Sequence, residues 1–134
     1  MKQIFTLAMG VLATLALTMS TAWAGSPHFV SCGVASVNGT CVSVSGKEAG
    51  LGSEEQISIE LTATAQCINP GNHHPQAGNK ADIAAGTDVP VQNGKANYTV
   101  TGCAEFQPDC TPPMTVVLTD ILITDTTNNI SCTP

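Results

Sequence analysis

Six cysteines constrain this chain more than any other feature of its sequence. They lie between positions 32 and 132 of 134 residues. An even number of cysteines in a small exported domain is typical of a disulfide framework. Zinc sites use close pairs such as Cys-x-x-Cys, and haem attachment uses Cys-x-x-Cys-His, but the chain has neither pattern. We therefore expect three disulfides and a fold that depends on them.

The first 24 residues have the parts of a secretory signal. Lys2 gives a short, positively charged start, an apolar stretch runs from Ile4 to Met19, and Ala22-Trp23-Ala24 fits the small-x-small motif of signal peptidase. The apolar stretch is shorter than the roughly 20 residues that span a bilayer. We expect cleavage after Ala24, export to a periplasm or out of the cell, and no membrane insertion afterwards. Residues 25–134 are then expected to form a single domain.

The charge balance is acidic and excludes some partners. The chain has ten Asp and Glu, four Lys and no Arg, which gives a net charge of −6. Lys2 belongs to the predicted signal, so only three lysines remain in residues 25–134. Three scattered lysines cannot form the basic surface that nucleic acid requires, nor a polybasic patch for anionic lipid. The expected partner is therefore a protein or a surface ligand, and not nucleic acid.

Alternating apolar and polar side chains predict a β-sheet protein. The clearest case is Ile57–Cys67, where the alternation indicates a strand with one buried face. Glycines interrupt residues 47–55, and Asn79–Ala85 is the one candidate for a short helical turn. The pattern predicts an all-β fold, an antiparallel immunoglobulin-like β-sandwich of six or seven short strands. The other expected strands are Phe29–Val37, Thr40–Ser45, Thr87–Gln92, Lys95–Gly102 and Met114–Thr124. In the last of these the alternation slips near Thr119-Asp120, which indicates either a bulge or burial on both faces.

Two Asn-Gly pairs predict hairpins, and the first hairpin restricts the disulfides. Asn38-Gly39 and Asn93-Gly94 both suit a two-residue type I′ turn. The first turn would place Cys32 and Cys41 about 13 Å apart at ~3.3 Å per residue, beyond the reach of about 7 Å for a disulfide. With strands that alternate in direction, the favoured pairs are Cys32–Cys132, Cys67–Cys110 and Cys41–Cys103. The rival arrangement pairs Cys103 with Cys110 and Cys41 with Cys67.

The loop after Cys67 is the strongest candidate for a binding site. It is long and polar, and loops held on a rigid sandwich are common binding surfaces. The residues expected to bind are Asn69, Asn72, His73, His74 and Gln76.

The same loop is the candidate metal site. His73 and His74 could ligate copper or zinc through imidazole nitrogen. Adjacent residues rarely both face one ion, so further ligands would be needed, with His28, Met114 and Asp109 as candidates. The alternative is an exposed loop with two solvated histidines. Calcium would need an irregular site from Asp120, Asp125 or the Glu54-Glu55 pair.

The sequence gives little support for catalysis. It has no Gly-x-Ser-x-Gly elbow and no glycine-rich phosphate loop. The cysteines are better used in disulfides than as nucleophiles. Glu54-Glu55 fits an exposed turn better than the acid pair of a glycosidase. We expect a protein that is not an enzyme, and a small secreted hydrolase or an inhibitor of one is the weaker alternative.

Two segments resemble small exported bacterial proteins of unassigned function. They are Val44–Gly52, which reads VSGKEAGLG, and Cys67–Asn72, which reads CINPGN. The resemblance covers the middle part of the chain and includes no catalytic or binding residue. It implies an exported bacterial protein that is not an enzyme.

These observations predict an exported, non-enzymatic β-sandwich that acts as a binding or structural module. Its working surface is expected at one end, where Asn69–Gln76 and Cys103–Pro113 would lie together. The alternative is a periplasmic metal-binding protein that uses His73 and His74. Val116–Ile123 is strongly β-prone, and an uncovered edge there would allow self-association or the addition of a partner strand.

Overall fold

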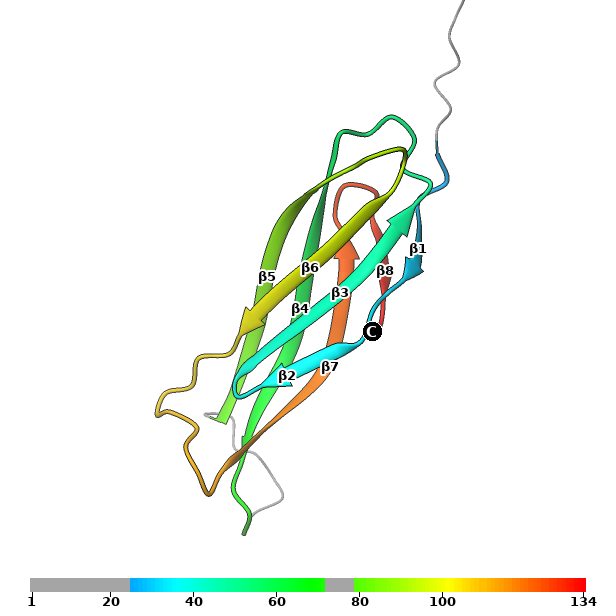
Figure 1. Cartoon of the computed structure of the whole chain (residues 1–134). Helices are drawn as coiled ribbons and strands as arrows, with labels where there is room; N and C mark the ends of the chain where they lie inside the picture. Colours follow the sequence, from blue (N-terminus) through cyan, green and yellow to red (C-terminus); the bar gives the residue numbers. More distant parts are fainter. Residues whose placement is uncertain (1–24, 72–78) are drawn as a thin grey trace, which may run out of the picture.

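The computed structural model describes residues 25–71 and 79–134. The predicted signal, residues 1–24, lies outside the described residues, and so do Asn72, His73, His74 and Gln76 of the predicted loop. The described part holds eight strands in two antiparallel sheets that pack face to face (Figure 1). It contains no helix that is long and apolar enough to cross a membrane. The strands are β1 (His28–Ser31), β2 (Ala35–Asn38), β3 (Cys41–Ala49), β4 (Gln56–Ile68), β5 (Lys80–Pro90), β6 (Ala96–Cys103), β7 (Thr115–Asp125) and β8 (Ile130–Cys132).

Two strands organise the two sheets. In sheet A, β3 pairs with β6 along one side, while β1 and β2 pair with successive parts of its other side. In sheet B the strand order is β5-β4-β7-β8. Every pairing is antiparallel. The all-β, two-sheet class is therefore confirmed, and the immunoglobulin-like topology stays a prediction.

The core lies between the sheets and follows the alternation of β4. The apolar residues of this strand, from Ile57 to Cys67, are all at most 5% exposed, as predicted. Val42 and Val44 of β3 and Val100 of β6 meet them from the other sheet. Each fully buried Val, Leu or Ile side chain contributes about 1.5–3 kcal/mol, so this aliphatic layer is the main stabilising element besides the disulfides.

The three disulfides are Cys32–Cys132, Cys41–Cys103 and Cys67–Cys110, which are the favoured pairs. Cys41–Cys103 joins directly opposed residues of β3 and β6. Cys67–Cys110 ties the end of β4 to the loop before β7, and Cys32–Cys132 joins the β1–β2 connection of sheet A to the end of β8 in sheet B. All six cysteines are bonded, which indicates an oxidising, exported environment.

The first predicted hairpin is partly wrong. The expected strand Phe29–Val37 is broken into β1 and β2 at Gly33. Gly33 has a φ of 92°, and any side chain at this position would overlap the Ser45 carbonyl oxygen. Asn38 pairs with Cys41, so the turn is centred on Gly39-Thr40 and not on Asn38-Gly39. Gly39 has a φ of 62° and supplies the positive φ that the first central residue of such a turn needs.

The second predicted turn is confirmed, but its two flanking strands belong to different sheets and do not form a hairpin. Asn93 and Gly94 have φ values of 53° and 72°, as the turn requires. However, β5 pairs with β4 while β6 pairs with β3, so the turn connects the two sheets. The candidate helical turn at Asn79–Ala85 is not formed from Lys80 onward. Lys80–Pro90 forms one strand because β4 offers it a continuous ladder over its whole length.

The predicted bulge in the last long strand is confirmed. The β4–β7 register shifts between Thr62 and Thr64, and Asp120 adopts a φ of 55°. The short strand β8, which follows β7 and pairs with its last residues, was not predicted.

Gly46 allows β3 to continue past the predicted end of this strand at Ser45. It lies opposite Tyr98 in the β3–β6 register, and a side chain at position 46 would overlap the Tyr98 hydroxyl. That hydroxyl donates a hydrogen bond to the Cys32 carbonyl oxygen at 3.0 Å, and the Tyr98 ring packs edge-on against Phe29.

Replacing Gly46 by alanine is expected to lower the free energy of unfolding by about 3 kcal/mol, because overpacking displaces Tyr98. Urea denaturation measures the loss. The control is Gly71→Ala, since an added methyl group there meets no atom within 4 Å. Equal stability of the two variants would contradict the tight contact at Gly46.

Candidate functional site

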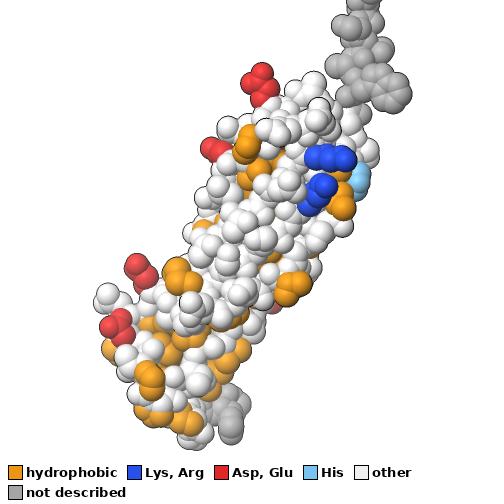
Figure 2. All heavy atoms as spheres, viewed as in Figure 1, with side chains coloured by type: hydrophobic (Ala, Val, Ile, Leu, Met, Phe, Trp, Pro, Cys, Tyr) orange, Lys and Arg blue, Asp and Glu red, His pale blue; other side chains and the backbone are white. Residues whose placement is uncertain are grey.

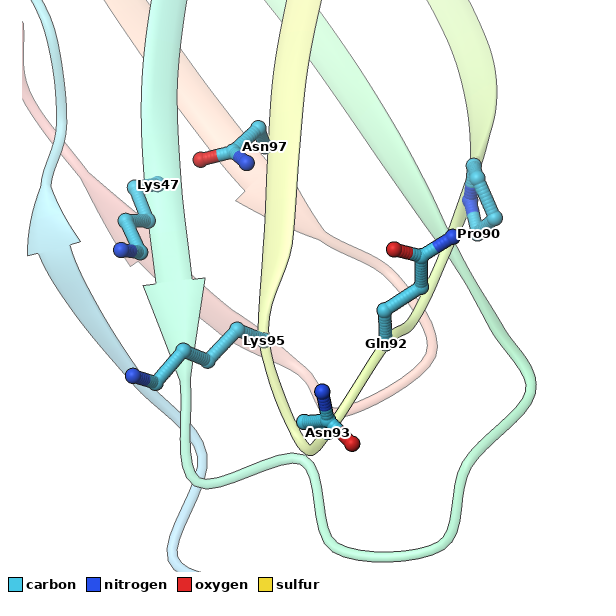
Figure 3. Close-up of a pocket in the computed structure, with 6 residues that line it drawn as sticks. All are labelled: Lys47, Pro90, Gln92, Asn93, Lys95 and Asn97. Carbon is cyan, nitrogen blue, oxygen red and sulfur yellow. The ribbon is translucent and has the colours of Figure 1, made fainter.

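A polar cleft of about 400 Å³ opens where the β5–β6 turn meets β3 (Figure 3). The two lysine side chains in it extend the same way, one from β3 and one from just before β6. The lining residues are Lys47, Pro90, Gln92, Asn93, Lys95 and Asn97.

Backbone hydrogen bonds hold the turn side of the cleft. Gln92 and Lys95 exchange two of them, at 2.8 and 3.0 Å, across the turn. The tip is anchored as well, because the carbonyl oxygen of Gly94 accepts from the Leu51 N–H at 3.0 Å. The Val91 N–H donates to the Glu55 carbonyl oxygen at 2.9 Å. These hydrogen bonds fix the turn and the lining residues that it carries, which favours a site that is formed before a ligand binds.

The strand side of the cleft comes from the outer face of sheet A. Lys47 lies opposite Asn97 in the β3–β6 register. The next outward pairs along these strands are hydroxyl pairs. Ser45 and Thr99 are hydrogen-bonded at 2.8 Å, and Ser43 and Thr101 at 2.9 Å. A row of hydroxyl groups therefore leads to the cleft along the sheet.

Positive charge is concentrated at the cleft. Lys47 and Lys95 are two of the three lysines in residues 25–134, and no carboxylate is among the described residues that line the cleft. Lys80 begins β5 while Pro90 at the cleft ends it, which separates Lys80 from the site by about 30 Å at ~3.3 Å per residue. Figure 2 shows two lysines side by side with a histidine, well apart from the acidic side chains in that view.

The chemistry of the lining suits an anionic polar ligand. The lysine ammonium groups only donate hydrogen bonds, whereas the amide side chains of Gln92, Asn93 and Asn97 both donate and accept. A ligand with a carboxylate or sulfate group and several hydroxyl groups could use both kinds of partner.

The predicted working surface, formed by the loops that follow β4 and β6, lies at the end of the sandwich opposite the lysine cleft. The Cys67–Cys110 bridge brings the start of the Asn69–Gln76 loop next to the Cys103–Pro113 loop, as expected. Within the described part, a cleft of about 500 Å³ runs along the second loop. It is lined by Thr40, Ala104, Glu105, Phe106, Gln107, Asp109, Cys110 and Thr111.

The predicted metal ligands do not come together in the part of the chain that the structure describes. His28 starts β1 and its Nδ1 donates to the Ser26 carbonyl oxygen at 2.8 Å, while Asp109 and Met114 lie at the other end, beside the Cys67–Cys110 bridge. Met114 Sδ is 3.7 Å from Cys67 Sγ. No three described His, Cys, Asp or Glu side chains are grouped so as to hold a metal ion. Copper or zinc at His73 and His74 stays a prediction.

Two of the calcium candidates lie close together, and a third lies apart from them. Asp125 and Glu54 share the side-chain amide of Asn128, which donates to Asp125 Oδ2 at 2.7 Å and to Glu54 Oε2 at 3.1 Å. Asp120 lies apart from them in the β7 bulge. The Asn128 amide thus ties the β7–β8 turn to the loop that carries Glu54. A calcium site from these residues stays a prediction.

Glu48 is an acidic residue inside the core. It follows Lys47 on β3, points inward and is 0% exposed, and its two carboxylate oxygens are buried with no hydrogen-bond partner in good geometry among the described residues. Burial, then the neighbouring Asp125, then Glu54, raise the pKa of Glu48 to about 8. Asp125 is also fully buried, but it accepts backbone hydrogen bonds from Thr127 and Asn128 at 2.9 and 3.2 Å. Glu48 is therefore a destabilising group whenever it is charged.

Comparison with protein-family models, with curated proteins and with solved structures finds no match to this chain. A function must therefore be inferred from the chemistry of the cleft that Lys47 and Lys95 line.

Sequence reasoning missed the lysine cleft. Its residues come from two segments that meet only through the β3–β6 pairing, and the Asn93-Gly94 turn was expected to keep both of its strands in one sheet. The available signal was the rarity of lysine in an acidic chain.

Proposed function

We propose that this protein is an exported, non-enzymatic binding module that recognises an acidic saccharide at the lysine cleft. The observation that carries the proposal is that Lys47 and Lys95 both line a cleft whose described lining residues include no acidic side chain. An anion placed between two ammonium groups relieves their mutual repulsion and gains charge-assisted hydrogen bonds. The disulfide-stapled sandwich supplies the rigid support that such a module needs.

The size and polarity of the cleft support a saccharide as the charged ligand. A volume of about 400 Å³ is within the usual range of small-molecule sites. The amide side chains in the lining and the Ser and Thr hydroxyl groups along sheet A match the hydroxyl groups of a sugar. No aromatic side chain is among the lining residues that the structure describes, so hydrogen bonds and charge, and not stacking, would supply the affinity.

A binding surface at the Cys110 end is the second candidate. The favouring observation is the Cys67–Cys110 bridge, which holds the two predicted loops together. Glu105 and Asp109 line the described cleft at this end, so it would suit a neutral or cationic partner and not an anionic one.

Removal of either cleft lysine is expected to weaken binding of an acidic saccharide at least tenfold, because each lost charge-assisted hydrogen bond is worth about 1.5–3 kcal/mol. Calorimetry with digalacturonic acid and its uncharged methyl ester compares Lys47→Gln, Lys95→Gln and the matched control Lys80→Gln. We expect the acid to bind the unmodified protein and the Lys80 variant equally, and added salt to weaken binding. Equal losses in all three lysine variants, or equal binding of acid and ester, would contradict the proposal.

A further inference from the structure

The exposed large hydrophobic side chains of the described residues lie on strands at one lateral side of the sandwich. Their exposed fractions run from 37% to 83%, and they lie on β1, the β1–β2 connection, β2 and β7. The Cys32–Cys132 bridge joins the β1–β2 connection to the end of β8, next to β7, so these elements share one side. The residues are Val30, Val34, Val37, Val117 and Leu122.

The same side carries an open strand edge. β7 pairs with β4 from Thr115 onward, but β8 covers only Ile123–Asp125. Within the described residues, Thr115–Thr119 makes no backbone hydrogen bond beyond those to β4. The backbone groups on the outer side of this segment are therefore free to pair with another strand.

The other outer strand of sheet B is protected, in contrast. β5 carries Lys80, Asp82, Asp88 and Pro90, and charges and proline at a sheet edge oppose pairing with another strand. Thr115–Thr119 contains neither a charge nor a proline. Among the outer strands of sheet B, the unprotected edge is therefore Thr115–Thr119 of β7.

We propose that Thr115–Thr119 pairs with the same segment of a second copy of this chain, antiparallel about a two-fold axis at Val117. The segment reads Thr-Val-Val-Leu-Thr, which is nearly the same in both directions. Pairing about Val117 places Thr115 opposite Thr119 of the second copy and Val116 opposite Leu118, and Val117 faces its own equivalent. Thr–Thr and aliphatic pairs of this kind are favourable neighbours across antiparallel strands.

Charge also favours this segment as the contact. The chain has a net charge of −6, so two copies repel each other over most of their surfaces. The uncharged segment lets them approach, and the nearest acidic residue, Asp120, would face Met114 of the second copy. Five paired residues with a rim of valines form a small interface, so the dimer is weak and depends on concentration.

The test is sedimentation of the exported protein between about 10 µM and 1 mM, the range over which small interfaces populate. We expect a monomer–dimer equilibrium that Val117→Lys weakens at least tenfold. The matched control is Ala84→Lys on the exposed face of β5, which should leave the dimer unchanged. A protein that stays monomeric throughout, or a dimer that only the Ala84 variant disrupts, would overturn the proposal.

A charge-swap experiment keeps the test valid if a single variant folds poorly. Val117→Lys and Val117→Glu are each expected to be monomeric, because like charges would meet at the two-fold axis. An equimolar mixture of the two is expected to form a heterodimer. Failure of the mixture to associate, with both variants folded by circular dichroism, would show that position 117 does not face its equivalent. The lysine cleft lies beside the β5–β6 turn, so ligand binding and dimer formation can fail independently.

Discussion

Glu48→Gln is expected to raise the free energy of unfolding at pH 8 by several kcal/mol. Burial and Asp125 raise the pKa of Glu48 from 4.5 to about 8. Each pKa unit corresponds to about 1.4 kcal/mol, so charging this carboxyl costs the folded state on the order of 5 kcal/mol at most. Glutamine has nearly the same shape and carries no charge. A gain of this size corresponds to an increase in melting temperature of about 10 °C or more.

The pH dependence gives the sign of the effect independently. The folded protein holds the Glu48 proton more tightly than the unfolded chain does. Protonation of Glu48 therefore stabilises the fold fully below pH 4.5, and this contribution to the free energy of unfolding is lost as the pH rises to 8. The ionisable groups that face Glu48 are Asp125, Glu54 and Tyr98. The difference in stability between Glu48→Gln and the unmodified protein should therefore grow between pH 4.5 and 8 and then level off.

Glu55→Gln is the control for this experiment. Glu55 is exposed, and its replacement removes one negative charge from the same region. Thermal unfolding of the three proteins at pH 5 and pH 8 measures the effect. A Glu48→Gln variant that is less stable than the unmodified protein at pH 8 would show that the Glu48 carboxylate has a stabilising partner in the folded protein.

Replacing Cys32 and Cys132 together by alanine is expected to lower the free energy of unfolding by about 4–5 kcal/mol. The bond closes a loop with a sequence separation of 100, the longest of the three, and chain entropy assigns about 4.7 kcal/mol to a loop of that length. It also joins the edges of the two sheets, where β1, β2 and β8 are all short. Its loss should therefore loosen these strands before the centre of the sandwich.

The matched comparison is the double replacement of Cys41 and Cys103. These residues lie opposite each other in the β3–β6 ladder, which continues to hold the two strands together when the bond is absent. Urea denaturation should rank the Cys41/Cys103 variant as the more stable of the two. Amide exchange should show faster opening of β1 and β8 only when Cys32 and Cys132 are replaced. The reverse order would contradict the role assigned to the inter-sheet bond.

The sequence was informative where one physical rule acted alone. Ile57–Cys67 is predictable because a strand with one buried face must alternate, and its apolar residues are all buried. Strand direction and the short reach of a disulfide favoured the observed pairs, but they left open the rival arrangement that pairs Cys103 with Cys110 and Cys41 with Cys67. The bulge near Asp120 is visible because an extra residue breaks the alternation. Glu48 could have been placed inside by the same rule, since it continues the buried series of Val42 and Val44.

The sequence was less informative where several interactions compete. An Asn-Gly pair specifies a tight turn, but it does not say which sheet each flanking strand joins. Turn preference alone placed the first hairpin on Asn38-Gly39, whereas pairing with β3 moved the turn by one residue. The lysine cleft was not predictable, because Lys47 and Lys95 are brought together only by the long-range β3–β6 pairing and the turn beside it.

The most direct test of the binding function uses nuclear magnetic resonance of the exported protein with only its lysines labelled with ¹⁵N. The backbone amide signals of Lys47, Lys80 and Lys95 then report on the cleft and on a distant site in one spectrum. On addition of digalacturonic acid, we predict that the Lys47 and Lys95 signals shift with a common dissociation constant while the Lys80 signal stays in place, and that the methyl ester shifts none of them. A Lys80 signal that moves with the others, or three signals that do not move, would contradict recognition of an acidic saccharide at the lysine cleft.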